Sequence, residues 1–174
     1  MIFDVVIRSS IMAALLSLGF VSGLFGQSER GIGPAPQFRE LSREDRARLD
    51  RQRAVIAAAA KARYGTPRLT GTANDLPVLQ KLIDDMAFNK TQTYELQCLG
   101  VVFGDVLASE LPLRWVIVTD EFGIDPTLRF KSTTLQVNAL TMISKRIERD
   151  ERVNVSDLLR TTREYLADNE KKIR

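Results

Sequence analysis

The chain has 174 residues, of which 44% are hydrophobic and 27% charged, so its composition is that of an ordinary globular protein with enough apolar residues for one core. Its net charge of +3 is too small to indicate nucleic-acid binding by itself. The sequence has no histidine, which excludes Ser-His-Asp and Cys-His catalysis, a histidine general base and histidine-ligated zinc. Because Cys98 is the only cysteine, there can be no internal disulfide, and its position within a predicted helix favours a small buried side chain over a reactive thiol.

The first feature along the chain is an apolar run, Ile11–Phe25, that follows Arg8. Its 15 residues match the length of a secretory hydrophobic region and are fewer than the roughly 20 that a spanning helix needs. We therefore predict that residues 1–26 are a signal peptide and that the protein is periplasmic or otherwise exported. An uncleaved segment that anchors the protein in the inner membrane is the alternative, and a buried cytosolic helix is a third. Residues 27–41 are rich in Gly, Pro and Ser and predict a linker, followed by a single domain over residues 42–174.

A basic helix is predicted to open this domain. Ser42 and Asp45 have the spacing of a capping box, and Gly65 follows Tyr64 as a stop signal. Residues 39–68 contain nine basic and four acidic side chains, interleaved at helical spacing. That pattern is typical of a solvated, ion-paired face. A basic arm that contacts anionic lipid headgroups is the alternative interpretation.

A second helix is predicted after Thr66–Ala73, with Asn74 or Asp75 as its cap and Pro77 in its first turn. Together with the basic helix it makes an N-terminal helical pair. Its expected buried stripe is Leu79, Leu82, Ile83 and Met86.

The central element is a helix that begins at Thr91 or Thr93 and ends at about Leu111, because Pro112 disfavours helical geometry in the residue before it. It is apolar nearly all round, as is typical of a buried helix. Small residues recur every four positions along one ridge, at Gly100, Gly104 and Ala108.

A glycine costs about 1 kcal/mol relative to alanine inside a helix, so the ridge predicts the close approach of another element. A membrane dimer face is disfavoured because Asp105 and Glu110 interrupt a segment that is too short to span.

After Pro112 the apolar pattern changes to period two, which predicts a β-hairpin. The first strand has Arg114, Val116 and Val118 on one side and Trp115, Ile117 and Thr119 on the other. The predicted turn is 121–126, the returning strand is 128–130, and residues 133–137 form a third strand. Two further helices are predicted, capped by Asn138 and Ser156.

Three motifs carry a resemblance to a known family: L-G-x-x-F-G-D-x-L at 99–107, R-W-V-x-V-x-D-E-F-G at 114–123 and M-I-S-K-R at 142–146. Over about Tyr94 to Leu159 the sequence resembles the bacterial family catalogued as domain of unknown function 3806, with the helical lead-in from about Arg46 that is usual there. The resemblance supports the fold and implies no activity.

Asp105 is the most conspicuous charge, because the rest of its helix is mostly apolar. A buried carboxylate must be paired, hydrogen-bonded or neutralised. A structural ion pair is favoured, and a ligand-binding or catalytic carboxylate is the alternative. Candidate partners for Asp105 are Arg114, Arg129, Lys145 and Arg146. A carboxylate pair of the glycosidase kind, formed by Asp105 with Glu110 or Asp120, is also conceivable, although the sequence fixes no separation.

The hairpin supplies the remaining candidate binding residues. Asp120, Glu121 and Asp125 cluster at the turn, but they match no calcium-binding loop and we predict no metal site. Trp115 is favoured as a core residue, with an interface hot spot as the alternative. No Walker A, Rossmann or H-E-x-x-H pattern occurs, so no cofactor is predicted. The candidate binding set is Asp105, Arg114, Trp115, Asp120, Glu121 and Arg129, and no residue is predicted to be catalytic.

The expected fold is α+β, with a three-stranded antiparallel sheet packed on several helices. The expected function is a non-enzymatic interaction or accessory domain of the bacterial cell envelope that recognises another protein, in one version an immunity-type protein. The alternative is a small-ligand binder or a carboxylate-dependent enzyme that uses Asp105 and the hairpin charges. Membrane contact through the N-terminal segment and the basic helix is a further possibility, and nucleic acid is not an expected partner.

Overall fold

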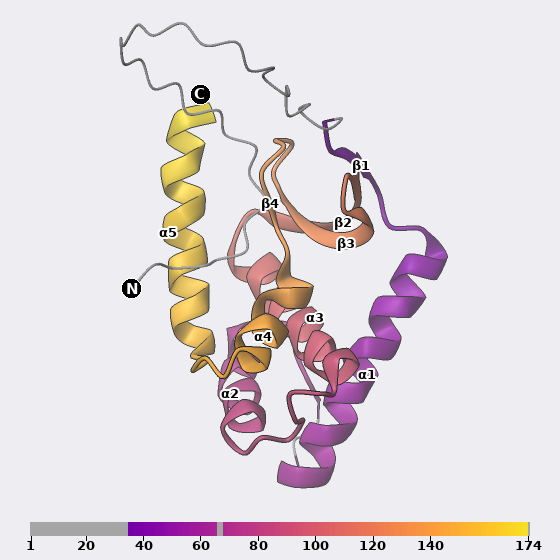
Figure 1. The fold of residues 1–174 in the computed structure, drawn as a ribbon, viewed down its shortest axis with the longest axis vertical. Helices are drawn as coiled ribbons and strands as arrows, with labels where there is room; N and C mark the ends of the chain where they lie inside the picture. The colour runs from indigo at the N-terminus through magenta and orange to yellow at the C-terminus, as the bar shows by residue number, and fades with distance from the viewer. Residues whose placement is uncertain (1–34, 66–67, 174) are drawn as a thin grey trace, which may run out of the picture.

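The computed structural model describes residues 35–65 and 68–173, and these form an α+β fold (Figure 1). In chain order the elements are β1 (Gln37–Arg39), α1 (Arg43–Tyr64), a 3₁₀ turn (Ala73–Asp75), α2 (Leu76–Asp84), α3 (Thr93–Glu110), β2 (Leu113–Asp120), β3 (Gly123–Phe130), β4 (Gln136–Val137), α4 (Ala139–Glu148) and α5 (Val155–Ile173). The predicted signal or anchor segment, residues 1–26, lies outside the described residues. Among the helices within the described ranges, none has both the length and the apolar character needed to cross a bilayer.

The ends of α1 are fixed by local sequence signals, as predicted. The Ser42 hydroxyl accepts the Asp45 N–H at 3.1 Å, and the Asp45 carboxylate accepts the Ser42 N–H at 2.8 Å. Gly65 ends the helix with a φ of 67°, which glycine adopts without strain. Leu49, Ile56 and Ala60 form the buried side of α1, which packs along α3 (Figure 1).

The α3 helix is the centre of the core, and ten of its residues are buried. Its glycine ridge allows two close approaches. A Cβ added at Gly100 would lie 2.5 Å from the carbonyl oxygens of Ala139 and Leu140, so α4 crosses almost directly on the α3 backbone. A Cβ added at Gly104 would lie 2.3 Å from the Trp115 ring, so β2 packs on α3 at the same ridge. The predicted buried helix and the hairpin that folds over it are both confirmed.

The sheet is antiparallel with strand order β1-β2-β3-β4, so it has four strands where three were predicted. Residues 37–39, at the end of the predicted linker 27–41, pair with 117–119 of β2 as strand β1. The third predicted strand, 133–137, is reduced to Gln136 and Val137. A strand of three residues carries too little alternation to be recognised in sequence, which is why β1 was missed.

The hairpin turn is shorter than predicted. It is confined to residues 121–122, and β3 already begins at Gly123, which pairs with Asp120. The prediction took Pro126 as part of the turn, yet it pairs with Ile117 inside β3. A proline is tolerated in a strand at a position where no backbone N–H is needed for a hydrogen bond to a neighbouring strand. Pro126 lies outside the part of β3 that pairs with β4, which is limited to Leu128 and Arg129.

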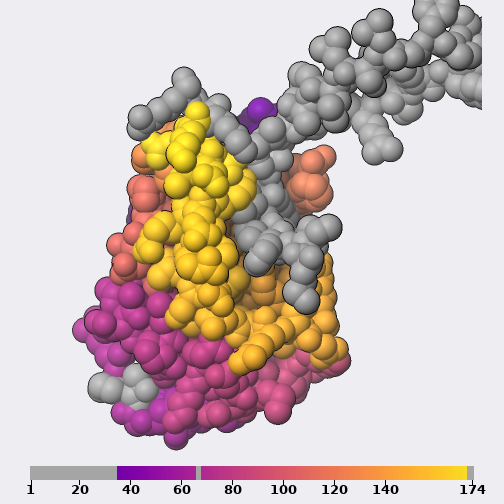
Figure 2. All heavy atoms as spheres, turned by 90° about the vertical axis from the view of Figure 1, so that its left-hand side faces the viewer, coloured from indigo at the N-terminus to yellow at the C-terminus, as the bar shows by residue number. Residues whose placement is uncertain are grey.

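The predictions for α2 and α5 need correction. Helix α2 ends at Asp84, and Met86 adopts a φ of 45° and is 80% exposed, so it does not extend the buried stripe. Leu79 and Leu82 of that stripe are buried. At α5 the Asn154 side chain, and not Ser156, accepts the N–H of Asp157 at 3.0 Å. Figure 2 shows α5 on the outside of the molecule, next to the segment that contains α2, with which it makes contacts.

Candidate functional site

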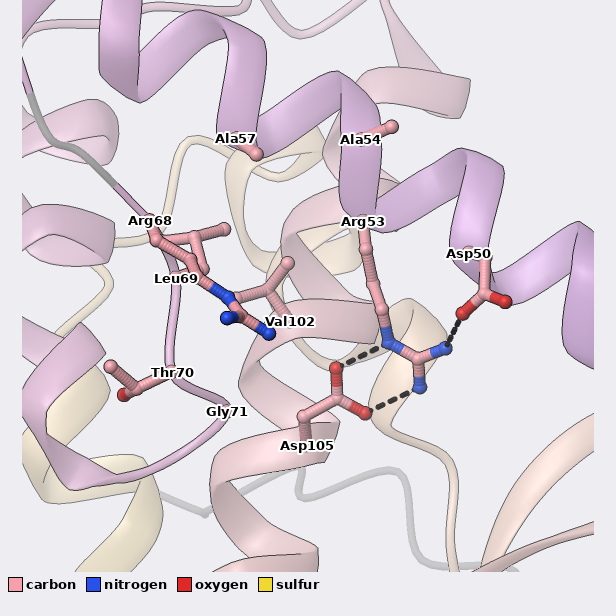
Figure 3. Close-up of a pocket in the computed structure, with 10 residues that line it drawn as sticks. All are labelled: Asp50, Arg53, Ala54, Ala57, Arg68, Leu69, Thr70, Gly71, Val102 and Asp105. Atoms are coloured by element: carbon pink, nitrogen blue, oxygen red, sulfur yellow. Dashed lines mark hydrogen bonds and ion pairs between the residues drawn. The ribbon is translucent and has the colours of Figure 1, made fainter.

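A solvent-open cavity of about 470 Å³ lies between α1, the loop 68–71 and α3 (Figure 3). Residues on one face of α1 form one side of the cavity, and the loop forms the opposite side. Two residues of α3 lie between these sides and complete the lining. The lining residues are Asp50, Arg53, Ala54, Ala57, Arg68, Leu69, Thr70, Gly71, Val102 and Asp105.

An ion pair between helices forms one wall of this cavity. Arg53 Nε donates to Asp105 Oδ2 at 2.6 Å and Nη2 donates to Oδ1 at 2.7 Å, a two-point contact that joins α1 to α3 (Figure 3). Trp115 Nε1 donates to the same Oδ1 at 2.9 Å. The hydrogen bonds to Asp105 raise the pKa of Arg53 above its ordinary value, so the guanidinium stays charged. Both oxygens of Asp105 therefore accept strong hydrogen bonds, as in a structural ion pair.

The partner of Asp105 differs from the candidates named from sequence. Arg114, Arg129, Lys145 and Arg146 were expected, and each is wrong, because the partner is Arg53 on α1. Arg53 and Asp105 are 52 positions apart in sequence, and α1 carries several other arginines along its length. No local signal distinguishes Arg53 from its neighbours; only the packing of α1 on α3 does.

The opposite wall is held by a second carboxylate. Asp75, which is 3% exposed, accepts the N–H groups of Thr70 at 2.9 Å and of Gly71 at 2.7 Å, and the Thr70 hydroxyl at 3.0 Å. Asp75 was predicted as a possible helix cap, but its side chain makes no cap hydrogen bond to α2. It fixes the loop instead, and Gly71 there has a φ of 70° that suits glycine.

Arg68 is the remaining charged side chain of the cavity. It is exposed, and the described part of the chain places no carboxylate in ion-pairing contact with it. Figure 3 shows its guanidinium extending from the loop into the space beside Val102.

The other predicted binding residues do not converge on the cavity. Arg114 pairs with Glu40, and Arg129 donates to the carbonyls of Ser132 and Thr133 at 2.9 and 2.6 Å while it lies over the Phe38 ring at 4.4 Å. On β2, Arg114 and Trp115 are consecutive and therefore point to opposite faces of the sheet. The structure thus brings Asp105 and Trp115 together and separates them from both hairpin arginines.

The hairpin turn is a separate surface feature. Asp120 accepts the Phe122 N–H at 2.9 Å, and Glu121 beside it is exposed. Phe122 and Ile124 are 65% and 64% exposed, which is unusual for large apolar side chains. The sequence pattern predicts a turn here, and nothing in it distinguishes the apolar pair from other turn residues.

Within residues 35–65 and 68–173, no group of three or more His, Cys, Asp or Glu side chains is placed to hold a metal ion. Burial raises the pKa of the Cys98 thiol to about 11, so the reactive thiolate is scarce at neutral pH.

Comparison with known proteins identifies a family and a fold. No curated protein matches the sequence. A crystal structure from Bacteroides thetaiotaomicron shares the fold with a TM-score of 0.68 at 12% identity, and the similarity covers 79% of this chain and 50% of that one, so this chain spans half the length of that protein. Residues 75–158 match the family described as domain of unknown function (DUF3806). The match therefore identifies a DUF3806 segment within the chain, from the start of α2 to the first turn of α5.

Proposed function

We propose that this protein is a non-enzymatic interaction domain, exported to the bacterial cell envelope, that recognises another protein through the tip of the β2–β3 hairpin. The observation that carries the proposal is the exposure of Phe122 and Ile124 at 65% and 64%. Large apolar side chains that gather at one exposed place are common in binding sites. Exposed aromatic side chains are also frequent anchors of protein interfaces.

The charges around this apolar pair indicate what the partner offers. Asp120, Glu121 and Asp125 lie next to Phe122 and Ile124 in sequence, so acidic side chains flank the apolar pair along the hairpin. A complementary surface is an apolar pocket with basic residues around it. Binding of this kind needs no catalytic group, in keeping with an immunity-type or accessory role.

An enzymatic alternative has little support in the geometry. A general base needs an accessible lone pair, and Arg53 and Trp115 already donate three hydrogen bonds to the carboxylate of Asp105, which offers about four acceptor positions. A ligand site that joined Asp105 to the hairpin charges is not proposed, because Arg114 and Arg129 have other partners.

Export rests on the apolar segment Ile11–Phe25, and membrane contact would involve that segment and the arginines of α1. Salt-sensitive binding to vesicles that contain anionic lipid would support the membrane contact.

The experiment compares proteins that co-purify with the tagged chain from the native envelope. The test variant is Phe122→Ser with Ile124→Ser, and the matched control is Met86→Ser, which removes an apolar side chain that is 80% exposed elsewhere. A partner that is retained by the wild type and by the control but lost by the tip variant supports the proposal. Repeated absence of any partner, or a partner that the tip variant retains, contradicts it.

A further inference from the structure

The floor of the cavity is apolar because α1 presents alanines there. Ala54 and Ala57 leave space where longer side chains of the same helix would reach the loop, and Leu69 and Val102 add apolar surface. The cavity volume of about 470 Å³ lies within the range of about 300–1,000 Å³ found for small-molecule sites. The floor can therefore receive an apolar group of moderate size.

The charges of the cavity leave one cation available. Asp50 and Asp105 both accept hydrogen bonds from Arg53, at 2.8 Å and at 2.6–2.7 Å, so these three groups are joined to one another and together carry one net negative charge. Arg68 has no such partner within the described ranges, and its guanidinium extends into the open space (Figure 3). A ligand that enters the cavity thus meets one unpaired positive charge.

Both walls are held in place before a ligand arrives. Asp75 ties down the backbone of Thr70 and Gly71, and the Arg53–Asp105 pair ties α1 to α3. A site whose walls are already ordered loses less free energy on binding than one that must be ordered by its ligand. The geometry therefore resembles a formed site with one adjustable side chain at its rim.

We propose that this cavity binds a single carboxylate attached to an apolar group, with Arg68 pairing the carboxylate and Ala54, Ala57 and Val102 contacting the apolar part. A guanidinium and a carboxylate match in shape and can form two parallel hydrogen bonds. A dianionic phosphate is disfavoured, since Arg68 offers one compensating charge and Asp50 and Asp105 lie in the same cavity. The proposal goes beyond the protein contact at the hairpin and does not depend on it.

The carboxylate has two chemical sources, a free organic acid or the C-terminus of a polypeptide. Calorimetric titration of the full chain with 4-phenylbutyrate and with the tripeptide acetyl-alanyl-valyl-leucine separates them. The matched controls are the two amides, which keep the apolar group and lose the charge. We expect at least one acid to bind, about tenfold or more tightly than its amide, as for a hydrogen bond between charged groups. If neither acid binds with a dissociation constant below about 1 mM, or if acids and amides bind alike, the proposal is wrong.

Variants of Arg68 and Ala57 test whether the acid binds through this arginine and in this cavity. Arg68→Ala should weaken binding about tenfold, and Arg68→Lys should restore part of the affinity. Arg48→Ala is the control, because Arg48 is an exposed arginine on the side of α1 that faces away from Arg53 and Ala57. Ala57→Leu should block the apolar group and leave helix content, measured by circular dichroism, unchanged. The proposed site would be contradicted if Arg68→Ala and Arg48→Ala bound the acid with equal affinity, or if a folded Ala57→Leu bound it as tightly as the wild type. The hairpin-tip variants should leave this binding unchanged.

Discussion

Replacement of Gly100 by alanine tests the contact on which the core depends. In an ordinary helix interior this change stabilises by about 1 kcal/mol, because glycine is a poor helix former. Here the added Cβ would lie 2.5 Å from the carbonyl oxygens of Ala139 and Leu140. Ordinary van der Waals contact begins at 3.4 Å, so the Cβ would be 0.9 Å too close. The obstacle is the backbone of α4, which cannot rotate away as a side chain can.

Overpacking of a core typically costs about 1–3 kcal/mol, and a clash with backbone belongs at the upper end of that range. After the gain of about 1 kcal/mol in helix propensity, we expect Gly100→Ala to lower the free energy of unfolding by about 2 kcal/mol. With a urea dependence of about 2 kcal/mol per molar, the unfolding midpoint should fall by about 1 M.

The assay is urea unfolding followed by circular dichroism, with Trp115 emission as a second signal. Trp115 is the only tryptophan, so its emission reports one place in the fold. Gly104→Ala should also destabilise, and unlike Gly100→Ala it should change the native emission, because its Cβ would lie 2.3 Å from the Trp115 ring. Ser109→Ala, at an exposed position of α3, controls for helix propensity. An unchanged or higher midpoint for Gly100→Ala would refute the close crossing of α3 and α4.

Three other predictions concern charged and thiol groups. Arg53→Ala should lower the free energy of unfolding by about 1–3 kcal/mol in urea denaturation, because it leaves the carboxylate of Asp105 without its charged partner where the side chain is only 18% exposed. The hydrogen bond from Arg39 holds the pKa of Asp45 well below its ordinary value of 3.8, so the stabilising contribution of this carboxylate is present above about pH 4 and is lost as the pH falls further. The melting temperature of Asp45→Asn should therefore lie below that of the wild type at pH 7, and the gap should narrow below pH 4. Cys98, with its pKa raised to about 11, should resist alkylation by iodoacetamide at pH 8 in the native protein and react fully in denaturant.

The parts of the fold that were predictable are those whose causes are local in sequence. The capping box of Ser42 and Asp45 fixes the start of α1 within four residues of chain. The recurrence of Gly100 and Gly104 predicted close packing on α3, because two unfavourable residues on one ridge need compensation. It did not indicate which elements approach, and these are α4 and the Trp115 ring.

The parts that could not be predicted depend on contacts between distant segments. The Asp105 carboxylate predicted an ion pair, but Arg53 becomes its partner only because α1 crosses α3 at that level. Strand β1 exists because β2 offers an edge for pairing, and nothing in residues 37–39 alone requires a strand. The cavity belongs to the same class, because its two walls are brought together by tertiary packing alone.

The two proposed binding sites, at the hairpin tip and in the cavity, lie differently with respect to the DUF3806 segment. The hairpin tip, with Phe122 and Ile124, lies inside residues 75–158, as do Val102 and Asp105 of the cavity. Arg53 and Ala57 of α1 and Arg68 of the loop lie before that segment. Contact through the tip therefore uses residues that the DUF3806 segment itself supplies, whereas a bound carboxylate would depend on the helical lead-in. Because the ion pair of Arg53 with Asp105 joins these two parts, its loss should disturb the cavity more than the distant hairpin tip.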